Sequence, residues 1–215
     1  MSELRSISLF SGLTEETLSA IDRLTTTRQY PKNSIIINEG DVSNSMYLLM
    51  EGRVKVYLSD QDGREFVLNN LQPGDYFGDF SLLDDERRTA SIMTVETCVF
   101  KVLMKADFDR LRREHLEIND VLIGNLVGTI RHMTENVKSL ALKDVYGRIR
   151  KLLHQLAAED DDGKITEKLT QQEIANRVGS SREMVARILK NLATGGYIQS
   201  EKKQITLLRP LPEHY

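Results

Sequence analysis

The chain has 215 residues, of which 40% are hydrophobic and 28% charged, and its net charge is −3. This length can hold two small domains with separate cores. No segment approaches the eighteen or more apolar residues of a membrane span, and Met1–Phe10 lacks the basic start and apolar core of a signal peptide. One cysteine and four histidines exclude an internal disulfide and a Cys-rich zinc or iron–sulfur site. We therefore expect a protein of the reducing cytoplasm, without a metal centre.

The charge is divided unevenly along the chain. From Leu142 to the end, thirteen Lys and Arg stand against ten Asp and Glu, a net +3, which leaves −6 for Met1–Ala141. Four of those ten acids form the consecutive run Glu159–Asp162. The rest of the C-terminal part is basic, as binding to phosphates requires. We interpret this part as facing nucleic acid, although ordinary scatter also produces such a split.

The N-terminal part predicts a helix over Thr14–Leu24 and then a series of short strands. The apolar or β-branched runs are Ser34–Ile37, Met46–Met50, Val54–Leu58, Phe66–Leu71 and Cys98–Leu103. Between them lie the turn signals Glu39-Gly40-Asp41, Glu51-Gly52, Asp62-Gly63 and Pro73-Gly74-Asp75. Short strands at this spacing predict an antiparallel β-roll or barrel, with Cys98 as a buried strand residue.

A helical segment without proline follows, from about Lys105 to Lys143. Its apolar residues recur at intervals of three and four, at Leu122, Leu126, Ile130, Met133, Val137 and Leu140. A seam this narrow is typical of a two-stranded coiled coil, so it favours dimerisation. The alternative is that the seam packs on the roll of the same chain. Because Gly124 and Gly128 weaken the helix, packing must hold it.

The last part of the chain has the order of a winged helix-turn-helix. A helix over Val145–Ala157, the acidic loop and a short strand near Lys164–Thr166 come first. A capping box from Thr170 to Glu173 then opens a helix over Gln171–Val178. Gly179 supplies the turn, and a second capping box from Ser180 to Glu183 opens a helix to about Ala193. The predicted hairpin pairs Tyr197–Gln199 with Gln204–Leu208.

The helix over Ser181–Ala193 has two distinct faces. Its inward stripe consists of Val185, Ile188, Leu189 and Leu192. Arg182, Glu183, Arg187 and Lys190 lie elsewhere on the wheel, as in a recognition helix that enters the major groove. Arginine can donate twice to guanine and glutamate can accept from cytosine, whereas Ser181 and Thr170 at the helix starts can reach phosphates. Alternatively, Glu183 caps its helix and pairs with Arg187 on the surface.

The run Val178-Gly-Ser-Ser-Arg-Glu-Met-Val-Ala-Arg-Ile-Leu189 closely resembles the signature of the catabolite activator, or cyclic AMP receptor (Crp/Fnr), family of bacterial regulators. The resemblance covers nearly the whole chain and implies a homodimer that reads a TGTGA-like half-site in double-stranded DNA. Arg182, Glu183 and Arg187 match the three base readers. Lys202 stands where a glycine is common. The complete predicted DNA-binding set is Thr170, Gln172, Ser181, Arg182, Glu183, Arg187, Lys190 and Lys203.

The segment Phe77-Gly-Asp-Phe-Ser-Leu-Leu83, followed by Arg88-Thr-Ala90, resembles the phosphate-binding cassette of the same family. Glycine lets backbone amides approach an anion, Arg88 supplies a charge-assisted donor and Thr89 a hydroxyl. Asp79 replaces the glutamate that holds the ribose 2′-hydroxyl in the family, and it is one methylene shorter. The predicted effector-binding set is Gly78, Asp79, Phe80, Ser81, Arg88, Thr89 and, across the dimer, Met133 and Thr134.

Two alternatives concern this cassette. Arg87 lies beside Arg88, although Arg88-Thr-Ala fits the motif better. Arg88 could instead form a salt bridge with one of the acids at positions 84–86. We expect cyclic AMP or a related cyclic nucleotide as the effector; cyclic di-GMP, another ligand or an effector-independent protein are the alternatives.

Two further classes of protein fit the sequence less well. A cyclic-nucleotide-sensing regulatory subunit of a larger assembly would not need the C-terminal reading helix. An enzyme is the least supported class, because no nucleophile–base or metal-ligand spacing converges on one element. The run Glu159–Asp162 lies where the family contacts RNA polymerase, so RNA polymerase is an expected partner. This position is the basis for the hypothesis that the protein activates rather than represses transcription; the alternative is that the loop is merely solvated.

These interpretations predict an α+β chain in three parts. Residues 1–112 form an effector-binding, antiparallel β-roll of the cyclic-nucleotide-binding type. Residues 113–141 form a long dimerisation helix. Residues 142–215 form the winged helix-turn-helix domain.

Overall fold

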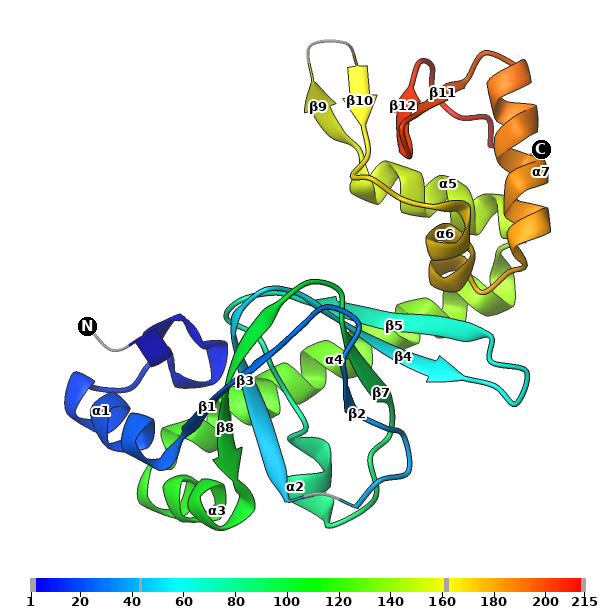
Figure 1. The fold of residues 1–215 in the computed structure, drawn as a ribbon. Coiled ribbons are helices and arrows are strands. Elements are labelled where there is room, and N and C mark those ends of the chain that lie inside the picture. The colour runs from blue at the N-terminus through cyan, green and yellow to red at the C-terminus, as the bar shows by residue number, and fades with distance from the viewer. Residues whose placement is uncertain (1–2, 43, 161–162, 214–215) are drawn as a thin grey trace. The chain divides into compact units, whose positions relative to one another are not determined.

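The structure is a computed structural model, and it describes residues 3–42, 44–160 and 163–213, with side chains outside 158–165. The chain divides into two compact units (Figure 1). One comprises residues 1–59 and 67–131, and the other residues 60–66 and 132–215. The predicted fold class is confirmed: an antiparallel β-domain is followed by a long helix and a C-terminal helical domain with a small sheet.

Two four-stranded sheets build the N-terminal domain. The first contains, in spatial order, β1 (Thr26–Tyr30), β8 (Cys98–Met104), β3 (Ser45–Glu51) and β6 (Tyr76–Phe77). The second contains β2 (Ile35–Ile37), β7 (Ser91–Thr94), β4 (Val54–Ser59) and β5 (Glu65–Leu71). Neighbouring strands pair antiparallel, as in the register Met46↔Leu103 between β3 and β8. The glycines of the four predicted turn signals, Gly40, Gly52, Gly63 and Gly74, all have positive φ.

Buried residues from strands of both sheets form the core of the roll. Its aromatic centre consists of Tyr47, Phe77 and Phe100, with the Tyr47 and Phe77 rings stacked at 5.1 Å and Phe100 edge-on to Phe77 at 5.6 Å. Such geometries suit the ring quadrupoles. Cys98 is fully buried in this cluster, as predicted for a strand residue.

Helices cover a second apolar cluster at one end of the roll. The helices up to the long one are the 3-10 helices η1 (Glu3–Ser6) and η2 (Ser8–Phe10), then α1 (Glu15–Leu24), α2 (Phe80–Asp84), α3 (Lys105–Glu114) and α4 (Glu117–Leu142). Thr14 caps α1 by accepting a hydrogen bond from the Thr17 amide at 3.3 Å. This cap explains why the predicted helix begins where it does.

The segment from Lys105 to Lys143 contains two helices, α3 and α4. His115, at φ −129 and ψ 85, leaves the helical region and ends α3. The Asn119 side chain then donates to the main-chain oxygen of Arg112 at 3.0 Å, which satisfies a carbonyl that the end of α3 leaves without a helical partner. An asparagine side chain therefore offsets part of the cost of the break between α3 and α4.

The predicted seam of α4 lies partly in the core and partly on the surface. Leu122 is only 3% exposed and packs in the apolar cluster of its own roll, so its assignment to the dimer seam is wrong. Ile130 and Val137, in contrast, are 64% and 65% exposed, and Met133 and Leu140 are exposed as well. The first turns of α4 therefore pack on the roll of the same chain, whereas the apolar side chains of its later turns are exposed.

The second unit contains the C-terminal helices and a third sheet. Its elements after α4 are α5 (Val145–Leu156), β9 (Ala158–Asp160), β10 (Gly163–Ile165), α6 (Gln171–Val178), α7 (Arg182–Thr194), β11 (Ile198–Glu201) and β12 (Gln204–Leu207). The sheet order is β11-β12-β10-β9 (Figure 1). Apolar residues of α5, α6, α7 and the β11–β12 hairpin share one core, as expected for a winged helix-turn-helix.

Candidate effector-binding and DNA-reading sites

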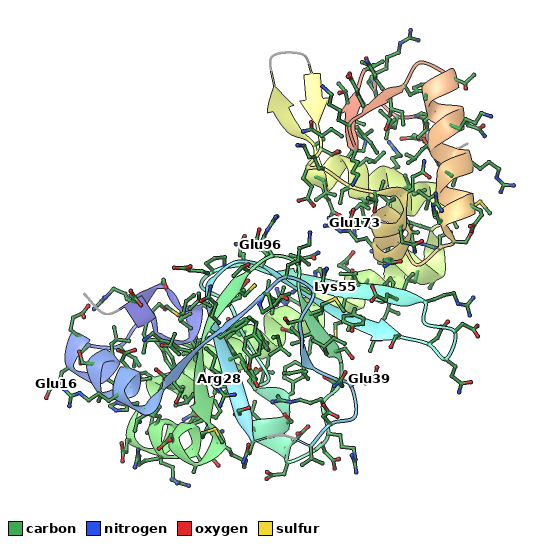
Figure 2. The ribbon with its side chains drawn as sticks, viewed as in Figure 1. Glu16, Arg28, Glu39, Lys55, Glu96 and Glu173 are labelled. Carbon is green, nitrogen blue, oxygen red and sulfur yellow. The ribbon has the colours of Figure 1, made fainter. Side chains whose placement is uncertain are left out.

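The predicted capping box at the start of α6 is present. Thr170 Oγ1 accepts a hydrogen bond from the Glu173 amide at 3.1 Å, and Glu173 Oε2 accepts one from the Thr170 amide at 2.6 Å. Glu173 is labelled in Figure 2. Burial alone would raise the pKa of Glu173, but these hydrogen bonds with Thr170 outweigh it and lower the pKa. The first helix of the pair therefore starts from a rigid, charge-assisted cap.

The second cap lies one residue later than predicted. Ser181, not Ser180, is the N-cap of α7, and its hydroxyl accepts from the Met184 amide at 3.2 Å. Methionine at that position cannot complete a capping box, so the box from Ser180 to Glu183 is wrong. Gly179 makes the turn in the left-handed region at φ 62.

The two faces of α7 are those that the periodicity predicts. Val185, Ile188, Leu189 and Leu192 are buried. Arg182, Glu183, Arg187 and Lys190 are exposed. The Arg187 guanidinium lies against the Met184 sulfur at 2.8 Å. An exposed, mainly basic face on a helix anchored by four buried side chains can enter a DNA groove without disturbing the core.

The wing is tied to the start of α6. The main-chain oxygen of Lys203 accepts from the Leu169 amide at 2.7 Å, next to the Thr170 cap. Lys202 and Lys203 connect β11 to β12, and both have positive φ, 48 and 70. The exposed Lys203 side chain, exposed Gln172 and half-buried Thr170 thus belong to neighbouring elements. Three further predicted DNA-contacting residues, Thr170, Gln172 and Lys203, therefore belong to the same small domain as α7.

In the predicted cassette, Arg88 is buried and bound to main-chain oxygens. It is 5% exposed and donates to Gly78 at 2.6 Å and to Ser45 at 2.5 Å. Gly78 has φ 85, and a Cβ atom there would lie 2.5 Å from Arg88 Nη1. Burial lowers the pKa of the Arg88 guanidinium, although Tyr47 and Asp79 act in the opposite direction. A glycine is therefore required for this arginine to sit where it does.

Asp79 and Ser81 are polar groups in an apolar setting. Burial raises the pKa of Asp79 to about 6, against the opposing effects of main-chain amides and of Arg88. Ser81 is 3% exposed, and its hydroxyl has no hydrogen-bond partner among the described residues. A buried hydroxyl without a partner is costly and suggests that a ligand supplies one. Phe80, between them, is half-buried.

The remaining predicted effector residues are more exposed. Thr89 lies on the surface beside the buried Arg88. Arg87 is exposed and donates to the main-chain oxygen of Gly40 at 2.8 Å. Met133 and Thr134 are exposed on α4, in the other compact unit, and their part in the site stays a prediction.

The sequence did not indicate one polar contact close to the cassette. Asn125 of α4 donates from Nδ2 to the Tyr76 hydroxyl at 3.0 Å. Burial raises the pKa of Tyr76 to about 12. Because Tyr76 lies three residues before Asp79, this bond joins the cassette directly to the long helix. No motif marks Tyr76 or Asn125, and the partners come together only in the fold.

Candidate metal sites and membrane-spanning helices are both absent from the described part of the chain. Within it, no group of three or more His, Cys, Asp or Glu side chains is arranged to hold a metal ion. Among the helices described there, none combines the length and apolarity needed to cross a membrane.

Comparison with known proteins connects both sites to families. Residues 27–115 match the cyclic nucleotide-binding domain, and residues 147–210 match the Crp-like helix-turn-helix domain. The chain is 33% identical over 207 residues to the CRP-like cAMP-activated global transcriptional regulator of Mycobacterium tuberculosis, covering 93% of this chain and 91% of that protein. It is also 33% identical over 189 residues to the cAMP-activated global transcriptional regulator Vfr of Pseudomonas aeruginosa, covering 84% and 88%.

A solved structure gives the same result. The c-di-GMP responsive global regulator CLP of Xanthomonas campestris superimposes with a TM-score of 0.83 at 25% identity, over 91% of this chain and 100% of that one. A cyclic nucleotide-binding domain followed by a Crp-like helix-turn-helix defines a DNA-binding transcription regulator, not an enzyme. The chain belongs to the Crp/Fnr family of bacterial transcription regulators.

Proposed function

We propose that the protein is a homodimer that binds a palindromic DNA site under the control of a small effector. Residues 1–112 would bind the effector, 113–141 would pair the chains and 142–215 would bind DNA, so the protein would act in the cytoplasm, with the DNA. The observation that carries the effector role is the buried Ser81 hydroxyl, which has no partner among the described residues and lies in the segment that holds Gly78 and Arg88.

The DNA-reading role rests on the exposed face of α7. Arg182, Glu183 and Arg187 match the base readers of the family, and all three are exposed. A TGTGA-like half-site offers guanines to the arginines and, on the other strand, cytosines to the glutamate. The phosphate backbone of the DNA would be contacted by Thr170, Gln172, Ser181, Lys190 and Lys203. Two such helices about 34 Å apart match a palindrome with half-sites one helical turn apart.

Fluorescence anisotropy with a labelled TGTGA palindrome tests this role. Arg182→Ala and Arg187→Ala should each weaken binding about tenfold or more, since a bidentate pair contributes about 1–3 kcal/mol. Arg113→Ala, which removes an equal charge from an exposed position on α3, is the matched control and should change affinity less than threefold. Equal affinity for a scrambled palindrome at physiological salt would contradict sequence-specific reading.

Dimerisation is proposed through the exposed stretch of α4. Leu126, Ile130, Met133, Val137 and Leu140 keep the three–four spacing of a coiled-coil seam, and four of them are exposed. Apolar side chains in such a row are stabilised by burial against a second helix. The identical helix of another chain has the same pattern, so a symmetric pair suits this surface.

Cyclic AMP or a related cyclic nucleotide is the proposed effector. A phosphate at Gly78 would accept from main-chain amides, from Ser81 and from Arg88, and Thr89 lies beside that arginine. The relatives from Mycobacterium tuberculosis and Pseudomonas aeruginosa are named as cAMP-activated. Asp79 would face the ribose with a shorter side chain than glutamate, and Met133 and Thr134 of the second chain would face the base.

Titration calorimetry with cyclic AMP, cyclic GMP and cyclic di-GMP tests the effector and its identity. Arg88→Met should weaken binding at least tenfold. Arg87→Met removes a neighbouring arginine that binds Gly40 instead, so its affinity should stay within threefold of the parent. Heat from one nucleotide that Arg88→Met abolishes would support the proposal. No heat from any of the three would contradict a cyclic nucleotide effector and favour an effector-independent regulator.

Cyclic di-GMP is a second candidate because of two observations. The superimposable regulator from Xanthomonas campestris is described as c-di-GMP responsive. Asp79 also alters the position that would hold a ribose hydroxyl. If the protein prefers this ligand, cyclic di-GMP should have the lowest dissociation constant of the three nucleotides in the same titration.

RNA polymerase is the proposed protein partner, through the acidic run Glu159–Asp162. Asp161 and Asp162 lie outside the described residues, and β9 and β10 flank them. In vitro transcription with this run replaced by serines tests the contact. Reduced output at unchanged DNA affinity is expected, and unchanged output would contradict it.

A further inference from the structure

Arg148, in the first turn of α5, binds the ends of two other helices. Its Nε donates to the main-chain oxygen of Val178 at 2.7 Å, and its Nη2 lies 3.4 Å from that of Gly179. Its Nη1 donates to the main-chain oxygen of Lys143 at 2.8 Å. Val178 and Gly179 end α6, whereas Lys143 directly follows the last residue of α4.

Arginine is well suited to this position. The last carbonyls of a helix have no partner within it, and together they carry a partial negative charge. A guanidinium offers donors in a planar fork and stays charged at any physiological pH. One Arg148 side chain can therefore satisfy two helix ends at once, which a lysine ammonium cannot do with the same geometry.

The chain around Arg148 leaves little freedom between these ends. The Asp144 carboxylate caps α5 by accepting from the Gly147 amide at 2.7 Å, so the connection from α4 to α5 is short and ordered. A Cβ atom at Gly179 would lie 3.4 Å from Leu140 Cδ2, so the helix-turn-helix turn packs on the last turns of α4. The guanidinium thus lies at a joint that is already closely packed.

We propose that Arg148 is a positioning residue that fixes the orientation of the reading helix α7 relative to the end of α4. The proposal rests on the proposed function, in which α7 reads DNA and α4 pairs the two chains. Palindromic DNA is bound well only when both reading helices are held at the half-site separation. Contacts that hold the turn before α7 against the end of α4 reduce the conformational freedom of α7 in the free protein. DNA binding then costs less conformational entropy.

DNA affinity of the full-length chain provides the first test. Arg148→Met removes all three hydrogen bonds, and Arg148→Lys retains a cation without the fork. Arg177→Met is the matched control, because Arg177 is on α6 and pairs with Glu167 at 2.8 Å. At a temperature where circular dichroism shows every variant folded, Arg148→Met should bind the operator at least tenfold more weakly. Arg148→Lys should be intermediate, and Arg177→Met within threefold of the parent.

Pulsed electron–electron spin resonance gives a readout that stability alone would not move. Nitroxides at Lys138→Cys on α4 and Ala193→Cys on α7 report their separation, and Cys98 is fully buried and so protected from labelling. Labelled chain is mixed with excess unlabelled chain, so that distances within one chain dominate. The parent and Arg177→Met should give one narrow distance distribution, and Arg148→Met a broad one.

The outcomes separate this proposal from the proposed function. Folded Arg148→Met with parental DNA affinity and an unchanged distance distribution would overturn the positioning role. If the parent chain binds no DNA, the proposed function fails, but the label distances still decide whether Arg148 holds α7 to α4. A narrow distance distribution in Arg148→Met would then be enough to overturn the positioning role of Arg148.

Discussion

Arg88 donates a hydrogen bond to the main-chain oxygen of Gly78 at 2.6 Å, and the space above Gly78 is the space that this guanidinium occupies. The two residues are ten positions apart, on either side of α2 and the acidic loop after it. The missing side chain at Gly78 therefore leaves room for the Arg88 guanidinium, in addition to any role in ligand binding.

Gly78→Ala should destabilise the protein and weaken effector binding. The new Cβ would lie 2.5 Å from Arg88 Nη1, in a backbone conformation with φ 85 that alanine adopts at a cost of about 1–3 kcal/mol. Urea unfolding and calorimetry measure the two effects. Gly12→Ala, where a Cβ would meet nothing within 4 Å, should change stability by less than about 0.5 kcal/mol. Equal effects from both variants would contradict the packing argument.

Ser81→Ala should separate stability from binding. The buried hydroxyl has no partner among the described residues, so its removal should leave the ligand-free protein equally stable or more stable by about 1–2 kcal/mol. Effector affinity should fall, because the phosphate loses a donor. A variant that loses stability and keeps full affinity would show that Ser81 has a structural partner instead.

Asp79→Asn should stabilise the protein in a pH-dependent way. Because burial raises the pKa of Asp79 to about 6, the folded state holds this proton up to that pH, whereas the unfolded chain loses it near 3.8. Stability is therefore lost as the pH rises through this interval, by up to about 3 kcal/mol. Unfolding midpoints of Asp79→Asn and parent should differ at pH 8 and converge toward pH 4. A difference that is constant with pH would contradict the shift.

Lys202→Gly should stabilise the wing. The two-residue connection of β11 and β12 places Lys202 at φ 48, where a side chain costs about 1 kcal/mol relative to glycine. A rise in the thermal unfolding midpoint of a few degrees is expected, with DNA affinity within twofold of the parent because Lys203 is retained. A lower midpoint would show that the Lys202 side chain makes a stabilising contact.

Ile130→Glu and Val137→Glu should dissociate the dimer. Each places a charge in the centre of the exposed apolar seam, which a partner helix would have to desolvate. Sedimentation velocity should show monomers. Val42→Glu, at a position on the roll that is 79% exposed, should leave the oligomeric state unchanged. Dimers of Ile130→Glu that are as stable as the parent would place the interface elsewhere.

The sequence predicted best those features whose causes are local. The α6 helix has its predicted bounds because Thr170 and Glu173 cap it within one turn. The buried stripe of α7 follows from its periodicity alone. Its cap was misplaced by one residue, since Ser180 and Ser181 are both suitable caps and the chain path decides between them.

Features that depend on distant parts of the chain were missed. Strands β1, β6, β7 and β9 were not predicted. β6 has two residues, β1 is exposed along most of its length, and β9 overlaps the acidic run, for which the sequence predicts a loop. Leu122 looked like part of the seam because a helical wheel does not show which face meets the roll. The Tyr76–Asn125 bond joins residues 49 positions apart, and the Arg148 contacts with Val178 and Gly179 cross 30 or more, so no local pattern marks them.

In the proposed function, an effector bound at Gly78, Ser81 and Arg88 controls DNA reading by α7. The decisive experiment is anisotropy of a TGTGA palindrome, measured for parent and Arg88→Met with and without saturating cyclic AMP. The parent should gain at least tenfold in affinity with the nucleotide, and Arg88→Met should gain nothing. Parental affinity that is identical with and without the nucleotide, or a gain that survives in Arg88→Met, would contradict the claim.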